Sequence, residues 1–149
     1  MPDIARNRQA SHRYHLLEKW EAGLVLTGTE VKSLREGKAQ IKDGYAALRD
    51  GEVWLHNVHI PPYAPATREN HEPERSRKLL LHRREIERVI GKTREKGLTL
   101  IPTRLYFSGG RAKVEIALAK GKDVGDKRQS IKDREMKREM ERAVRGRYG

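Results

Sequence analysis

The 149-residue sequence contains no cysteine, and aromatic residues make up only 5% of it. Without cysteine the chain has no disulfide framework, no thiolate metal ligand and no cysteine nucleophile, and it fits a reducing compartment. It has no run of about 18 apolar residues, and residues 1–14 lack the apolar segment of a secretion signal. We therefore expect a cytoplasmic protein with one core built mostly from Leu, Ile and Val.

Positive charge is abundant: 33 Lys and Arg against 21 Asp and Glu give a net charge of +12. Such an excess favours a polyanionic partner, and nucleic acid is the commonest, because each neutralised phosphate releases a counterion. A membrane surface would instead require a basic amphipathic helix with bulky apolar residues or Trp opposite the charges. Trp20 and Trp54 both fall in strand-like segments. We therefore expect nucleic acid as the partner and do not expect the protein to bind a membrane.

Residues 14–26 read as a long strand. A bulge or bend is expected near Ala22 and Gly23, because a glycine inside a strand often marks one. A short helix follows, with Thr29 as the expected N-cap and Gly37 closing its end.

Residues 44–60 are typical of a β-hairpin, with Asp50 and Gly51 in a type I′ turn. Alternation along the second arm predicts two faces. One carries Val53, Leu55 and Asn57, and the other carries Trp54, His56, Val58 and Ile60.

Structure resumes at residues 79–81, and a helix is expected over residues 83–96 with Gly97 after its end. A second hairpin is expected over residues 98–119, where Pro102 indicates an edge strand or a bulge. Five or six antiparallel strands with two or three short helices predict a mainly β fold, a small closed barrel of the OB kind.

The character of the sequence changes at Lys120. Residues 120–149 hold eleven Lys or Arg and six Asp or Glu, a net charge of +5 that leaves +7 for residues 1–119. We therefore expect an OB-like RNA-binding body over 1–119 and a basic tail over 120–149. From its composition the tail is expected to be disordered when free and helical when bound.

Catalytic and metal-binding patterns are absent from the sequence. His56 and His59 are three apart, which puts them on opposite faces of a strand, and no H-E-x-x-H, G-x-S-x-G or phosphate-loop pattern occurs. We expect no metal, no cofactor and no enzyme activity. Basic and aromatic surface remains, and exposed rings such as Tyr14 are candidates for stacking unpaired bases. Alternation places Trp54 and Tyr106 in the core instead.

A series of short motifs resembles one family, the SsrA-binding (SmpB) proteins. It begins with NRQASHRY at residues 7–14, which is similar to the family's N-[KR]-x-A-x-H-x-Y opening. The later motifs are WEAG at 20–23, GTEVKSLR at 28–35, GKA at 37–39, NVHI at 57–60, PER at 73–75, RKLLL at 77–81, GLTL at 97–100, KV at 113–114 and DKR at 126–128. Their order and spacing match from about residue 6 to the tail.

The resemblance implies an OB-like barrel that binds the tRNA-like domain of transfer-messenger RNA. It implies entry into the vacant A site of a stalled ribosome, where the tail reaches into the messenger channel beside the decoding region of the small subunit. Elongation factor Tu and alanyl-tRNA synthetase are expected only as partners through the RNA.

By position, the residues that match the family's RNA-binding positions are Arg8, Tyr14, Glu21, Leu80, His82 and Lys113. Those that match its ribosome and tail positions are Lys120, Lys122, Asp126, Lys127, Arg128, Ile131, Lys132 and Arg134. A carboxylate repels phosphate, so Glu21 is expected to accept hydrogen bonds from base amino groups. On pattern alone Leu80 is a core residue, while Lys113 turns outward. His82 stands where some members have Asn, and Asp123 replaces a Lys.

Two other readings fit a small basic chain. A structural ribosomal protein would stay with the subunits at high salt, whereas an adapter would wash off. An RNA-processing enzyme would turn over a labelled substrate, although the sequence shows no catalytic constellation for it.

Overall fold

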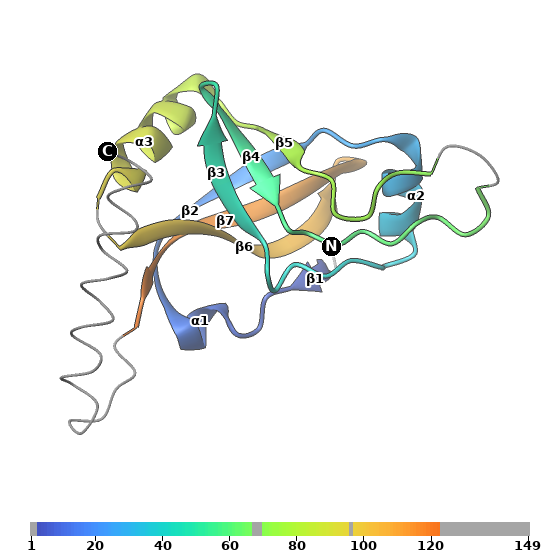
Figure 1. Ribbon diagram of the computed structural model, residues 1–149, viewed down its shortest axis with the longest axis horizontal. Helices are drawn as coiled ribbons and strands as arrows, with labels where there is room; N and C mark the ends of the chain where they lie inside the picture. Colours follow the sequence, from blue (N-terminus) through green and yellow to red (C-terminus); the bar gives the residue numbers. More distant parts are fainter. Residues whose placement is uncertain (1–2, 67–69, 96, 123–149) are drawn as a thin grey trace.

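The computed structural model describes residues 3–66, 70–95 and 97–122, and these form seven strands and three helices (Figure 1). In chain order the elements are β1 Asp3–Arg6, α1 Ala10–Arg13, β2 Tyr14–Leu24, α2 Gly28–Arg35, β3 Tyr45–Arg49, β4 Glu52–His56, β5 Arg77–Leu80, α3 Arg83–Thr93, β6 Leu98–Ser108 and β7 Arg111–Gly121. None of these helices is both long enough and apolar enough to cross a membrane.

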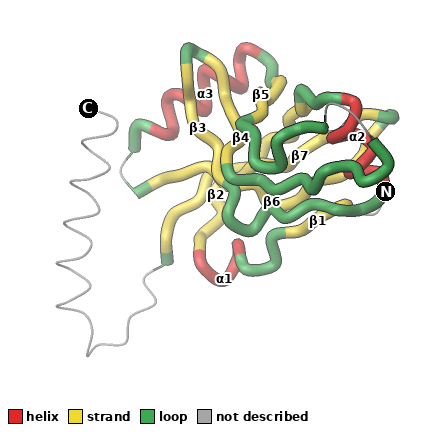
Figure 2. The backbone as a smooth tube through the Cα atoms, turned by 45° about the vertical axis from the view of Figure 1, so that its right-hand side comes forward, coloured by secondary structure: helices red, strands yellow, loops and turns green. Residues whose placement is uncertain are grey.

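The strands form one antiparallel sheet that closes on itself. Their order is β1-β6-β3-β4-β5-β2-β7, and β7 pairs again with β6, so six strands make a ring and β1 lies against β6. The helices lie at the periphery of these strands (Figure 2). The predicted OB-like fold is confirmed, with one strand more than expected, because the four residues of β1 are too short to give a sequence pattern.

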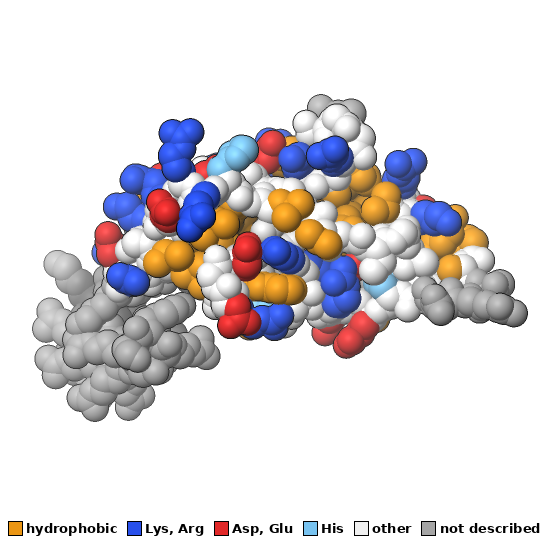
Figure 3. All heavy atoms as spheres, turned by 90° about the horizontal axis from the view of Figure 1, so that it is seen from above, with side chains coloured by type: hydrophobic (Ala, Val, Ile, Leu, Met, Phe, Trp, Pro, Cys, Tyr) orange, Lys and Arg blue, Asp and Glu red, His pale blue; other side chains and the backbone are white. Residues whose placement is uncertain are grey.

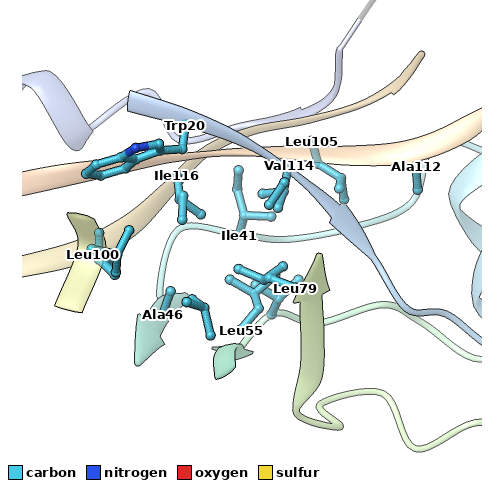
Figure 4. Packing of buried hydrophobic residues seen from close by; sticks show 14 of the residues in the cluster. Trp20, Ile41, Ala46, Leu55, Leu79, Leu100, Leu105, Ala112, Val114 and Ile116 are labelled. Carbon is cyan, nitrogen blue, oxygen red and sulfur yellow. The ribbon is translucent and has the colours of Figure 1, made fainter. Parts of the chain in front are cut away.

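The inside of the ring is packed with Leu, Ile and Val, as the composition predicts. Leu55, Leu79, Leu100 and Ile116 point toward one another between the strands, and each is at most 1% exposed (Figure 4). Trp20 joins them at 7% exposure, so its ring belongs to the core and not to a stacking surface.

The bulge in β2 lies at Leu16–Glu18, where its register against β7 shifts, and not at Ala22–Gly23. Gly23 lies where three strands meet: it pairs with Lys113 of β7 on one side and with Leu80 of β5 on the other. A Cβ on Gly23 would stand 3.3 Å from the Cβ of Leu80, which is unusually tight. The glycine therefore permits the close approach of β5 where β2 changes partners.

Helix α2 begins two residues earlier than predicted. Thr27, and not Thr29, is the N-cap, and a reciprocal capping box links its hydroxyl and backbone N–H to Glu30. Gly37 follows the helix at φ +76°, the left-handed conformation expected of a residue that closes a helix.

The turn between β3 and β4 is as predicted, with φ +53° at Asp50 and φ +75° at Gly51. The predicted faces are right only up to His56. Asn57 has φ +57°, and this left-handed residue shifts the alternation by one position. Val58 and Ile60 are therefore buried on the same side as Val53 and Leu55, which corrects their assignment to the opposite face.

Trp54 was expected in the core, but it lies half-buried on the outer face of β4, because Val53 and Leu55 occupy the inner face. The guanidinium of Arg49 stacks over its ring at 4.1 Å. Tyr106, by contrast, is 6% exposed and is confirmed as a buried ring.

Helix α3 ends at Thr93, earlier than the predicted Lys96, and buries Val89 and Thr93. The predicted bulge at Pro102 is confirmed by a register shift between Pro102 and Arg104. The edge-strand alternative is wrong, since β6 pairs with β7 on one side and with β1 and β3 on the other.

Candidate nucleic-acid interface

Strands β2, β5 and β7 meet beside the start of α3 and enclose an open groove of about 510 Å³. Four of the residues predicted to bind RNA line it: Glu21, Leu80, His82 and Lys113. They come from β2, β5, the N-cap of α3 and β7, so only the closed sheet brings them together. The groove is therefore the main candidate site.

The groove has an apolar floor and a charged rim. Leu24, Leu26, Val31 and Phe107 supply half-buried apolar surface, while Glu85, Arg111 and Lys113 stand among the polar groups around it. Exposed hydrophobic side chains lie between basic and acidic ones on the face seen in Figure 3. Such a surface fits a flat, partly apolar ligand that carries negative charge at its edge, which is the chemistry of a nucleotide.

Leu80 is 54% exposed, which corrects its assignment to the core on pattern alone. Its neighbour Leu79 is 0% exposed and fills the core. The two leucines alternate along β5, so one of them must point outward. Leu80 is the outward one, and it stands against Gly23 of β2, which has no side chain to cover it.

Glu21 is exposed on β2 and accepts a hydrogen bond from the phenolic hydroxyl of Tyr106 on β6. The guanidinium of Arg104 lies 4.2 Å from the centre of the Tyr106 ring. Arg104 is held in turn by the carboxylates of Glu115, at 3.1 Å, and Asp3, at 3.2 Å. A chain of contacts across four strands thus supports the Glu21 carboxylate.

The pKa values of Tyr106 and Glu115 show which members of this set of contacts are neutral and which are charged. Burial raises the pKa of Tyr106 to about 12, helped by its hydrogen bond to Glu21, so the phenol stays protonated and donates at neutral pH. Burial also raises the pKa of Glu115, but hydrogen bonds from Thr103 and Arg104 outweigh it and hold that pKa below its ordinary value. Glu115 is therefore an anion that anchors Arg104.

Two of the predicted residues lie away from the groove. Arg8 is exposed and lines a second hollow of about 440 Å³ together with Lys19 and Arg104. Tyr14 packs against the small cluster of Ala10, Ile101 and Ala119. It begins β2, about 23 Å from Glu21 at roughly 3.3 Å per residue. The six predicted positions therefore divide between the two ends of β2.

The last described residues of the chain are anchored to α1. Lys120 is exposed in β7, which continues through Gly121. The ammonium of Lys122 donates to the carbonyl oxygen of Ser11 at 2.6 Å, and its backbone N–H donates to that of Arg13 at 3.0 Å. The remaining predicted tail residues, Asp126, Lys127, Arg128, Ile131, Lys132 and Arg134, lie outside the described residues.

Tyr106 and Arg104 are parts of this site that reasoning from the sequence did not find. Neither carries a motif, and their link to Glu21 follows from the register of β6 against β7 and of β7 against β2. Within the ranges described above, no three or more His, Asp or Glu side chains gather where they could hold a metal ion.

The ring of strands and the groove together define a small, basic protein of the OB-like class with a charged-rimmed surface site. The model of the SmpB protein family matches residues 4–146. This chain belongs to the SmpB family, as its motifs predict.

Individual relatives agree over nearly the whole length. The SsrA-binding protein of Thermobifida fusca (strain YX) is 64% identical over 144 residues, which cover 97% of this chain and 90% of that protein. The SsrA-binding protein of Carboxydothermus hydrogenoformans is 57% identical over 145 residues, with 97% of each chain covered. A solved structure described as "tmRNA-SmpB: a journey to the center of the bacterial ribosome" is 46% identical, with a TM-score of 0.70, and the match covers 92% of this chain and 96% of that one.

Proposed function

We propose that this protein is a cytoplasmic RNA-binding adapter, and not an enzyme, that binds the tRNA-like domain of transfer-messenger RNA. It delivers this RNA to the A site of stalled ribosomes, where translation switches to the tagging message. The observation that carries the proposal is full-length membership of the SmpB family, with relatives named SsrA-binding proteins. The net charge of +12 supports a polyanionic partner.

In this proposal the groove selects the RNA. Lys113 neutralises a phosphate, and the exposed side chain of Leu80 packs against a base or a sugar. Glu21 accepts a hydrogen bond from a base and so contributes specificity. His82, which lines the same groove, forms a further hydrogen bond with the RNA. These are short-range contacts to an irregular, unpaired region, since the deep major groove of an RNA helix does not admit side chains.

A second surface, at the start of β2, lies away from the groove and consists of Arg8, Tyr14 and the exposed face of α1. In this proposal it contacts the RNA or the ribosome. The tail of residues 120–149 acts separately and enters the messenger channel, where its basic residues face ribosomal RNA. Lys122 supports this division, because its bond to Ser11 holds the end of the described body against α1. Elongation factor Tu and alanyl-tRNA synthetase are partners through the RNA.

The test is a binding measurement with full-length protein and the isolated tRNA-like domain, with ordinary tRNA as competitor. We expect tight binding that tRNA displaces only at large excess. Equal affinity for both RNAs would contradict the proposal, because charge alone does not distinguish them.

A further inference from the structure

Glu21 and Glu115 occupy directly opposed positions on β2 and β7. Two like charges in this arrangement disfavour the sheet. Glu115 is compensated by Arg104 and by Lys19, whose ammonium lies 3.4 Å from its carboxylate. Glu21 instead receives a hydrogen bond from a neutral phenol, so its negative charge stays available at the rim of the groove.

The donor to Glu21 is rigidly mounted. The Tyr106 ring is buried at 6% exposure, and Arg104 covers one face of it while bound to Glu115 and Asp3. The hydroxyl therefore points in a fixed direction and engages Oε2 of Glu21. The other oxygen, Oε1, belongs to an exposed side chain that lines the groove.

A carboxylate beside a site for RNA repels phosphate, so it weakens binding unless it gains a hydrogen bond in return. A glutamate on an open strand rotates freely, and ordering it upon binding costs affinity. A neighbour that holds the carboxylate in place beforehand removes most of that cost.

We propose that Tyr106 is a positioning residue for RNA recognition, which holds Glu21 as a preorganised acceptor for the exocyclic amino group of an unpaired base in the groove. Adenine, cytosine and guanine carry such a group, and uracil does not. Lys113, which lines the same groove, supplies the charge that balances Glu21 near the RNA backbone. The inference rests on the proposed function and specifies how its site discriminates.

The experiment compares wild type, Tyr106→Phe, Glu21→Ala and the double variant in binding to the tRNA-like domain, with tRNA as competitor. The Phe variant keeps the buried ring and loses only the hydroxyl. For Tyr106→Phe we expect about tenfold weaker binding to the tRNA-like domain, which is the effect of losing one charged hydrogen bond. The preference of this variant for that domain over tRNA is expected to fall by a similar factor. The dependence of affinity on salt is expected to stay unchanged, since no phosphate contact is removed.

A role through Glu21 makes the two changes non-additive, so Tyr106→Phe is expected to have no further effect once Glu21 is alanine. The inference would be overturned if the double variant lost affinity by the product of the two single losses, or if Tyr106→Phe bound RNA like wild type. Tyr45→Phe, at an exposed position at the start of β3, is the matched control and should bind normally. If wild type itself shows no preference for the tRNA-like domain, the proposed function fails, and the inference with it.

Discussion

Arg77 and Glu30 form an ion pair in which both side chains are fully buried, although 47 residues separate them. The Arg77 guanidinium also donates to the carbonyl oxygens of Val58, at 2.8 Å, and Pro73, at 3.0 Å. The pair therefore ties α2 to β5 and to the long segment before it. Since α2 and β5 supply Val31 and Leu80 to the groove, the buried pair also sets the shape of the candidate site.

Replacing Arg77 with Met is expected to destabilise the fold by about 3–5 kcal/mol, because it leaves the Glu30 carboxylate buried beside a weakened set of partners. Urea unfolding measures this change. Arg88→Ala is the control, since its ion pair with Glu18 lies in water and its loss should leave stability nearly unchanged. Equal effects of the two variants would contradict the role of burial.

Acid should weaken the same contact. Burial raises the pKa of Glu30, but hydrogen bonds from Arg75, from the Thr27 backbone and from Arg77 outweigh it, so this pKa lies below its ordinary value. The carboxylate therefore stabilises the fold fully above the ordinary glutamate pKa, and the contribution is lost as the pH falls through the depressed value.

The free energy of unfolding, measured with urea from neutral pH down into acid, checks the effect in wild type and in Glu30→Gln. The stability difference between them is expected to be largest at neutral pH and to shrink in acid. A difference that does not change with pH would show that Glu30 keeps one protonation state throughout.

The adjacent leucines of β5 should respond in opposite ways. Leu79→Ala is expected to cost about 2–5 kcal/mol of stability, because Leu79 is 0% exposed in the core. Leu80→Ala should barely change stability yet weaken RNA binding, because this side chain is 54% exposed in the groove. Thermal unfolding and RNA titration of both variants provide the measurements, and normal RNA binding by Leu80→Ala would remove it from the site.

Lys113 is expected to contact a phosphate. Lys113→Ala should lower the slope of log affinity against log salt by about one and weaken binding to all RNAs alike. Lys92→Ala, at the far end of α3 from His82 and paired with Glu95, is the matched control. The same slope in both variants and in wild type would exclude the phosphate contact.

Ending the chain at Lys122 should separate the two proposed activities. Binding to the tRNA-like domain is expected to stay within about twofold of wild type, because the groove and the Lys122–Ser11 contact remain. Tagging of incomplete proteins on stalled ribosomes in a translation assay should be lost. Loss of RNA binding by this variant would refute the division into body and tail.

Much of the fold was predictable, because its signals are local. The Asp50–Gly51 turn, the left-handed Gly37 after α2 and the bulge at Pro102 each follow from the conformational limits of one or two residues. The end of α3 does not, because this helix stops at Thr93 and not beside Gly97. The errors arose where a single residue altered a longer pattern. Asn57 in the left-handed conformation moved Val58 and Ile60 inward, and period-two alternation contains no mark of such a shift.

The candidate site was predictable only in part. The family resemblance named Glu21, Leu80, His82 and Lys113, and the structure places all four around one groove, although their contacts with RNA stay a prediction. It did not name Tyr106, which supports Glu21 from 85 residues away. The tail residues from Asp126 to Arg134 stay predictions too, since they lie outside the described part of the chain.

By itself the sequence determined the basic character of the protein, its β-rich class, its turns and its family, because these depend on composition and on neighbours along the chain. The tertiary structure alone decided which leucine of β5 faces outward, that Arg77 is buried on Glu30, and that Tyr106 holds Glu21. The physical reason is strand register. Closing the ring sets which distant residues stand opposite one another, and a shift by one residue would exchange every inward and outward side chain.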